Sequence, residues 1–129
     1  MAITPGMHGG ATITVDQSHT AAAHGVGNLP ILSTPALVAL VERAAVNAVR
    51  RGLEPGEETF GTAISLQRRA PTSIGKQIRA QAEVVEVADR RIRLTVQASD
   101  SSGVIAEGTH ERAIVDRDQF IWQAAARGA

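Results

Sequence analysis

Apolar residues recur at helical spacing through residues 33–52, "STPALVALVERAAVNAVRRG". At about 100° per residue, the Ala, Val and Leu side chains of this segment fall on one wide arc. The segment's ends carry residues that helix termini prefer: Ser33 or Thr34 as the N-cap, Pro35 in the first turn and Gly52 after the last. The pattern predicts one long helix with a broad apolar face.

Alternation of apolar and polar residues predicts strands elsewhere in the chain. The expected strands are residues 11–16, 57–68, 76–87, 91–99 and 104–115. Residues 17–33 are expected to form a long loop, which in compact domains is often functional. The tail "DRDQFIWQAAARG" is expected to be a short helical turn or a frayed end. A helix with so wide an apolar arc should be wrapped by a sheet, which predicts an α+β fold and a single domain over residues 1–129.

Several charged residues occupy positions that these patterns assign to the apolar, inward-facing side. Glu42 falls inside the apolar arc of the helix. Because strand side chains alternate between faces, Arg68 is expected to point inward and Arg69 outward. The inward face of the strand that ends in Arg68 is then Phe60, Thr62, Ile64, Leu66 and Arg68, and that of the last strand is Val104, Ala106, Gly108, His110, Arg112 and Ile114. Inward charges are expensive unless paired, and such violations tend to mark functional or strained sites.

A purely structural reading is open for each of these residues. Glu42 can pair with Arg68 or Arg112 in a buried bridge that only fixes the packing. A lone His110 is more often a satisfied structural histidine than a catalyst. His19 and His24 are spaced too loosely for a helical metal pair, so no metal site is expected.

Composition narrows the function classes. The 129 residues include 13 basic and 13 acidic side chains, which gives no reason to expect a nucleic acid or a membrane as partner. There is no cysteine, so disulfides and thiol chemistry are excluded. With two Phe, one Trp and no Tyr, a pocket of stacked aromatic rings is not expected. The N-terminus lacks the pattern of a signal peptide and no apolar run is long enough to span a bilayer, so we expect a cytoplasmic protein.

The element order, together with "GTAI" (61–64), the spacing of Pro71 and Gly75, and "GTHERAIVD" (108–116), resembles the hotdog-fold acyl-CoA thioesterases. The nearest group is the fluoroacetyl-CoA thioesterases, and the likeness runs from about Thr12 to Phe120. It implies a hotdog fold, in which one long central helix is wrapped by a five-stranded antiparallel sheet. It also implies a homodimer with joined sheets, a shared active site at the subunit interface, and no cofactor besides the coenzyme A of the substrate.

The resemblance further implies a catalytic Thr/Glu/His set and an oxyanion donor from a glycine N–H. Thr34, Glu42 and Gly61 match these positions, and Arg112 matches a family arginine. The histidine position, seven residues after Gly61, is Arg68 here. An arginine keeps its proton and cannot act as a base, but its fork binds carboxylate, phosphate or carbonyl oxygens. The aromatic residues that cover the small fluoroacyl pocket in the family are also missing from residues 21–32, "AAAHGVGNLPIL".

Two functions follow as hypotheses. In the first, the protein is a thioesterase in which Glu42, with a pKa raised by burial, is base or nucleophile. Gly61 N–H stabilises the oxyanion, Thr34 positions water or the carboxylate, and Arg68 orients the substrate. Arg112, His24 and His110 are then expected to bind substrate. In the second, the protein is a non-hydrolytic binding protein or enzyme on the same scaffold, with Arg68 and Arg112 holding an acidic small molecule.

Overall fold

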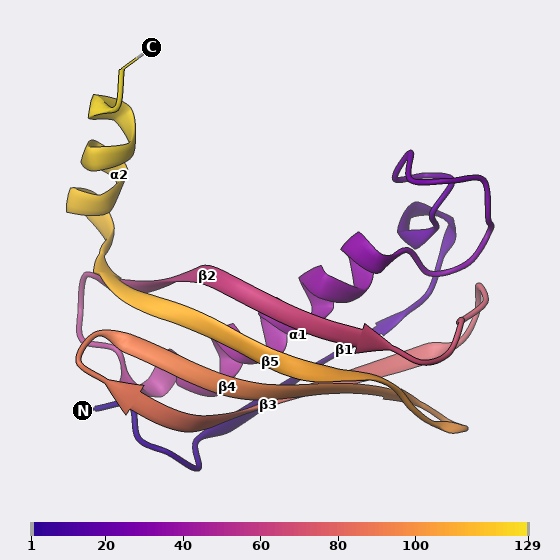
Figure 1. Cartoon of the computed structure of the whole chain (residues 1–129), viewed down its shortest axis with the longest axis horizontal. Helices are drawn as coiled ribbons and strands as arrows, with labels where there is room; N and C mark the ends of the chain where they lie inside the picture. The colour runs from indigo at the N-terminus through magenta and orange to yellow at the C-terminus, as the bar shows by residue number, and fades with distance from the viewer. Residues whose placement is uncertain (1, 129) are drawn as a thin grey trace.

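The computed structural model describes residues 2–128, in which one antiparallel sheet curls around a long helix (Figure 1). The sheet contains five strands in the order β1-β3-β4-β5-β2, so β1 and β2 form its edges. In chain order the strands and helices are β1 (His8–Thr14), α1 (Thr34–Val49), β2 (Glu57–Arg68), β3 (Gln77–Ala88), β4 (Arg91–Asp100), β5 (Gly103–Asp116) and α2 (Arg117–Ala126). The predicted order of strand, loop, helix and four strands is confirmed; β1 begins three residues earlier than expected.

Helix α1 begins and ends where the sequence predicts. The Ser33 hydroxyl caps it by accepting a hydrogen bond from the N–H of Ala36 at 3.1 Å, and proline occupies the first turn. A single 3₁₀ turn, Arg50–Gly52, closes the other end. The buried residues of α1 are Ala36, Leu37, Leu40, Val41, Ala44, Ala45, Ala48 and Val49, so its apolar arc is the centre of the core.

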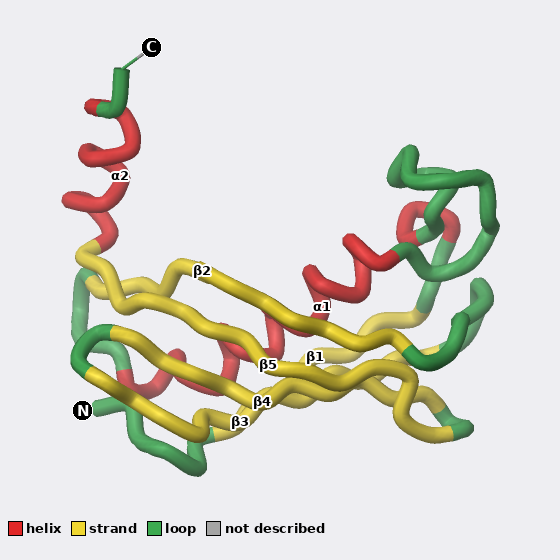
Figure 2. Tube along the Cα trace, in the orientation of Figure 1, coloured by secondary structure: helices red, strands yellow, loops and turns green. Residues whose placement is uncertain are grey.

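The inner faces of β3 and β4 supply most of the opposing core. Alternate residues on both strands are buried, as the period of two predicts: Ile78, Ala80, Ala82, Val84, Ile92, Leu94, Val96 and Ala98. These small and branched side chains let the sheet curve closely around α1 (Figure 2). A core with almost no aromatic residues is therefore packed mainly by Ala, Val, Leu and Ile.

A β-bulge in β2 overturns part of the expected side-chain pattern. Gly61 pairs with Arg112 and Ala63 with Glu111, so Thr62 is an extra residue in the ladder. An extra residue reverses which alternate positions face inward. Thr59 is therefore buried, whereas Phe60 is 50% exposed; the prediction that Phe60 and Thr62 face the core is wrong. Beyond the bulge Arg68 points inward and is half-buried, as expected.

A second register shift, at the start of β5, also changes which residues face the core. Ala98 pairs with Ala106 but Ser99 pairs with Val104, so Ile105 is the extra residue there. Ile105 is buried and Val104 is exposed, which corrects the prediction that Val104 faces the core. His110 and Arg112, 2% and 6% exposed, do point inward as predicted.

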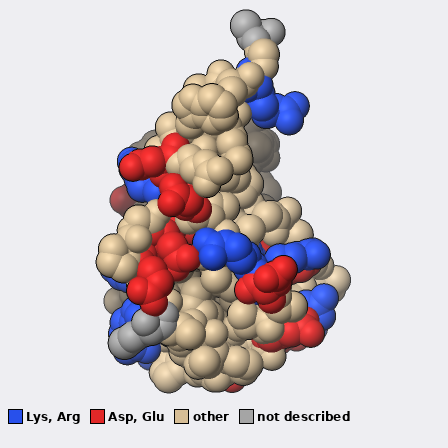
Figure 3. All heavy atoms as spheres, turned by 90° about the vertical axis from the view of Figure 1, so that its left-hand side faces the viewer, with Lys and Arg blue, Asp and Glu red and all other residues tan. Residues whose placement is uncertain are grey.

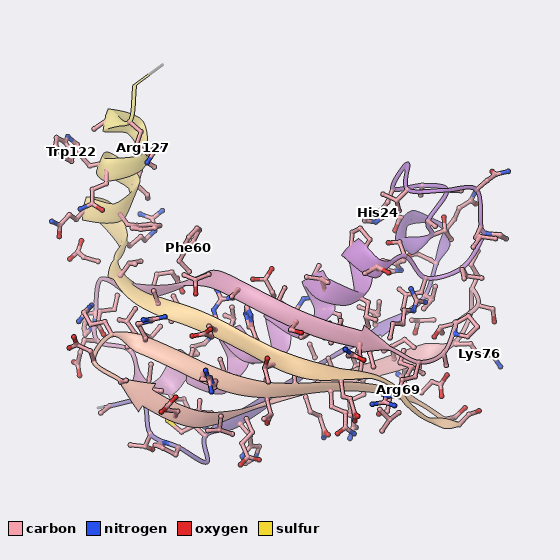
Figure 4. The ribbon with its side chains drawn as sticks, viewed as in Figure 1. His24, Phe60, Arg69, Lys76, Trp122 and Arg127 are labelled. Carbon is pink, nitrogen blue, oxygen red and sulfur yellow. The ribbon has the colours of Figure 1, made fainter. Side chains whose placement is uncertain are left out.

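The tail forms a ten-residue helix rather than a single turn. Asp116 caps α2 through the N–H of Gln119 at 3.0 Å, and the rings of Phe60 and Phe120 meet at 4.9 Å. From there α2 projects away from the sheet, and Trp122 points away from the rest of the chain (Figure 4). Strand β2 forms the upper edge of the sheet in Figure 1, between α2 at one end and the loop before α1 at the other.

The loop before α1 is partly ordered by its own hydrogen bonds. It contains the 3₁₀ turn Gln17–His19 and two isolated β-bridges, Thr20 with Leu32 and Ile31 with Ser73. Its tip is open to solvent, with Val26 and Leu29 both exposed.

The surface carries acidic and basic side chains interspersed, as on the end from which α2 projects (Figure 3). Within residues 2–128 neither helix is long and apolar enough to cross a membrane.

Gly9 is where β1 lies closest to α1, because a Cβ built on it would overlap the backbone of Asn47 and Ala48. We predict that Gly9→Ala lowers the free energy of unfolding by about 1–3 kcal/mol, since the strand must move off the helix. Urea denaturation measures this. Gly10→Ala is the control: its Cβ meets only the Ala80 carbonyl oxygen at 3.2 Å. An equal loss in both variants would contradict the close-packing argument.

Candidate active site

A charged cluster lies between α1 and the inner faces of β2 and β5. Glu42 Oε2 accepts a hydrogen bond from Arg112 Nη1 at 3.0 Å and lies 3.7 Å from His110 Nε2. Of the two partners that the sequence allows for Glu42, the structure shows Arg112. The sequence predicts a buried carboxylate, but 42% of the Glu42 side chain is exposed in the single chain. One side of the group therefore remains open to an incoming molecule.

Arg112 is held almost entirely by protein groups. Its Nε–H donates to Thr59 Oγ1 at 2.9 Å and Nη2–H to the Thr59 carbonyl at 3.0 Å. Its Nη1 contacts both Glu42 and, at 3.1 Å, His110 Nε2. Four of the five N–H donors of the guanidinium are thus engaged. Direct binding of substrate by Arg112 stays a prediction; its visible role is to hold Glu42.

His110 is neutral in this arrangement. Its Nδ1 lies 2.8 Å from the carbonyl oxygen of Ala63, which can only accept, so Nδ1 carries the proton. Nε2 is then the acceptor for the Arg112 Nη1–H. Burial lowers the pKa of His110 below its ordinary value, and it outweighs the hydrogen bond to Ala63, which acts in the opposite direction; the charges of Arg112 and Glu42 oppose each other. With its lone pair occupied, His110 is not a free base.

The absence of a side chain at Gly61 leaves space for the Glu42 carboxylate. A Cβ at position 61 would overlap Glu42 Oε2 and would lie 3.2 Å from Arg112 Nη1 and 3.3 Å from His110. The backbone of the β2 bulge therefore passes directly beside the carboxylate. This places two of the four expected catalytic residues, Glu42 and Gly61, side by side.

The other two expected catalytic residues, Thr34 and Arg68, form a second group. Arg68 Nη1 donates to Thr34 Oγ1 at 3.5 Å and Nε–H to the Ala70 carbonyl at 3.3 Å. Nη2 of Arg68 is buried and has no hydrogen-bond partner. Burial lowers the pKa of Arg68 from its ordinary value, although an arginine remains charged. Among residues 2–128 no carboxylate forms an ion pair with it.

A single chain does not bring these two groups together. Thr34 and Glu42 are eight residues apart on one helix, which separates them by about 12 Å along its axis. Gly61 and Arg68 are seven residues apart on one strand, a separation of about 20 Å. His24 lies exposed in the loop before α1, and the structure gives it no place in the Glu42 cluster.

Thr59 is a residue of this cluster that sequence reasoning missed. Its hydroxyl and carbonyl both accept from Arg112, so it fixes the guanidinium that holds Glu42. Simple alternation along β2 places Thr59 on the outer face, and only the bulge at Thr62 brings it inward. Within the described residues, His, Asp and Glu side chains do not gather in threes that would suit a metal ion.

The curled five-stranded sheet around one helix is the hotdog fold of the thioesterases. A thioesterase superfamily member from Thermus thermophilus shares it with a TM-score of 0.88, at 22% identity over 95% of this chain and 91% of its own. The family model for fluoroacetyl-CoA-specific thioesterases matches residues 15–118, and the chain belongs to that family.

Individual members of the family are similar over different lengths. The fluoroacetyl-CoA thioesterase of Streptantibioticus cattleyicolor is 39% identical over 90 residues, which are 70% of this chain and 65% of that protein, less than two thirds of its length. A solved structure of the fluoroacetyl-CoA thioesterase FlK superposes with a TM-score of 0.92, at 29% identity over the whole of both chains.

We predict that stability falls as the pH drops below about 6.5, the ordinary histidine pKa, because only the unfolded chain readily takes up the proton of His110. The loss continues until the pH passes the lowered pKa of the native histidine. Urea midpoints at pH 7.5 and 5.5 measure it. His110→Gln should flatten this pH dependence, and His8→Gln, at an exposed histidine, should leave it unchanged. Equal slopes in wild type and His110→Gln would refute the assignment.

Proposed function

We propose that the protein hydrolyses acyl-CoA thioesters, with Glu42 as the catalytic carboxylate. The observation that carries this proposal is the Glu42 carboxylate itself, held 3.0 Å from Arg112, beside the Gly61 backbone, and open on one side. Both protein contacts of the carboxylate go to Oε2, which leaves Oε1 for water or substrate.

Two routes fit this geometry. As a base, Glu42 takes a proton from water as the water oxygen attacks the thioester carbonyl; the C–S bond then breaks and Glu42 returns the proton to coenzyme A, which leaves as the thiol. As a nucleophile, Glu42 attacks the carbonyl directly and the C–S bond breaks, so coenzyme A leaves as the thiolate; water then cleaves the mixed anhydride to the free acid and the Glu42 carboxylate. In both routes the N–H of Gly61 is our candidate donor to the oxyanion. His110 takes no proton in either route, because its lone pair is already used.

We further propose that the working site is shared by two copies in a homodimer. Thr34 and Arg68 are too far along α1 and β2 to reach Glu42 and Gly61 of their own chain. Strand β2 is an edge strand, and antiparallel pairing of two such edges reverses their ends. The Thr34–Arg68 group of one copy then faces the Glu42–Gly61 group of the other. Phe60 and Ile64, which are exposed in the single chain, lie on this same strand, and their apolar surface favours contact with a second copy.

Related structures support coenzyme A thioesters as the substrate class. Variants of FlK have been solved with acetyl-CoA and with fluoroacetate and CoA, at 28% and 31% identity to this chain. The acyl group need not be fluoroacetyl, since residues 21–32 lack aromatic side chains to cover a small acyl pocket. We place this activity in the cytoplasm, because coenzyme A thioesters are made and used there.

The second candidate is a non-hydrolytic protein that binds an acidic small molecule. The observation in its favour is Arg68, which stands at the family's histidine position with an unpartnered Nη2. Release of free thiol from acyl-CoA by purified protein separates the two candidates.

We predict that Glu42→Gln lowers acyl-CoA turnover by about 10²–10⁴-fold, because an amide can neither take the proton nor form the anhydride. The amide oxygen can still accept from Arg112, so the fold should persist, which circular dichroism checks. Thiol release over a panel of acyl-CoAs is the measurement, and Glu83→Gln, on the exposed side of β3, is the control. Near-full activity in the Glu42 variant would end this mechanism.

Mixing Glu42→Gln with Thr34→Ala tests the shared site. Each variant alone should be impaired at both of its sites. Random mixed dimers should recover about a quarter of wild-type activity, because half of the dimers are mixed and one of their two sites carries neither change. The variants are co-refolded from denaturant and assayed for thiol release. If each site lay within one chain, mixing would recover nothing.

A further inference from the structure

Arg68 is a half-buried positive charge that forms no ion pair with any carboxylate of residues 2–128. Its two hydrogen bonds, at 3.3 and 3.5 Å, are long and go to neutral oxygens, and Nη2 is buried with none. Its neighbour Arg69 faces outward and pairs with Glu107 at 2.6 Å, and Arg112 pairs with Glu42 at 3.0 Å. The inward guanidinium of Arg68 therefore differs from those of Arg69 and Arg112, which each pair with a carboxylate.

An unpaired buried charge is costly, and proteins keep such groups where something binds to them. A guanidinium recognises carboxylate or phosphate oxygens with two parallel N–H donors. At Arg68, Nη2 has no acceptor but is covered by protein, so Nη1, which is held only by the 3.5 Å contact with Thr34, is the donor that an incoming anion meets first. An anionic oxygen balances the charge of this guanidinium, which a neutral acyl group does not.

The shared site does not remove this excess charge. If a second copy brings its Glu42 toward Arg68, that single carboxylate still faces both Arg68 and Arg112. His110 is neutral, so it adds no charge. The assembled site then carries two guanidinium groups and one carboxylate, which leaves one positive charge for the ligand to balance.

We propose that Arg68 binds a carboxylate at the far end of the acyl group, so that the substrates are half-thioesters of short dicarboxylic acids. This rests on the proposed thioesterase function and names its substrate class. The position of Arg68 favours the acyl end of the molecule: it is bonded to Thr34, which in the shared site faces the reacting carbonyl. The phosphates of coenzyme A lie at the other end of the pantetheine arm.

The test compares acetyl, malonyl and succinyl thioesters, each as the coenzyme A and the N-acetylcysteamine thioester, in wild type, Arg68→Met and Arg69→Met. Wild type should prefer malonyl or succinyl over acetyl by about 10² in kcat/KM, because a site built for a polar group discriminates against analogues without it. Arg68→Met should lose most of that ratio with both thiol carriers, and Arg69→Met should keep it. Arg68→His should move the preference toward the acetyl thioester.

Other outcomes separate the ways in which the proposal can fail. If Arg68→Met raises KM equally for every coenzyme A thioester and changes nothing for the N-acetylcysteamine series, Arg68 binds phosphate and the proposal is overturned. If wild type shows no preference for the anionic acyl groups but still needs Glu42, the thioesterase function stands without it.

If no thioester is cleaved, the thioesterase function fails. The binding of free dicarboxylates then tests whether Arg68 holds a carboxylate. Malonate or succinate should then raise the melting temperature of wild type and of Arg69→Met but not of Arg68→Met. Equal shifts in all three proteins, or no shift in any, would overturn the assignment.

Discussion

The ion pair between Glu42 and Arg112 is the contact around which the site is arranged. It joins the central helix to the sheet across 3.0 Å, with the guanidinium almost fully buried. A buried guanidinium is tolerated only if its donors are satisfied, and Thr59, Glu42 and neutral His110 together accept four N–H groups. The bulge that turns Thr59 inward and the glycine that leaves space at position 61 are thus requirements of this one contact.

The geometry of α1 sets the second constraint. A straight helix cannot bring side chains eight residues apart to one small molecule's reacting bond, since about 12 Å separates them. If Thr34 and Glu42 act on the same thioester, they belong to different copies of the chain. The free edge of β2 supplies a surface on which two copies can meet in the required reversed orientation. In that case catalysis requires the dimer, because the residues that one chain contributes to a site include either the carboxylate or the hydroxyl but not both.

The helix, the succession of elements along the chain and the inward direction of Glu42, Arg68, His110 and Arg112 could be predicted because each follows from local periodicity. The bulges at Thr62 and Ile105 could not, since an extra residue is defined only against the partner strand. That is why alternation alone predicts the wrong face for Phe60 and Val104 and does not identify Thr59. The choice of Arg112 over Arg68 as partner of Glu42 depends on strand order, which alternation along one strand does not contain.

An arginine at position 68, where the family resemblance implies a histidine, changes what the proposed site can do. Histidine can exchange a proton near neutral pH, whereas arginine only carries charge. In the proposed mechanism proton transfer falls to Glu42, because the lone pair of His110, the other inward candidate base, is bound to Arg112. The same replacement adds a fixed positive charge beside Thr34 that no carboxylate of residues 2–128 neutralises. In the proposed specificity, a substrate with its own negative charge balances this group and is oriented by it, so an arginine that cannot act as a base can still determine which substrate is bound.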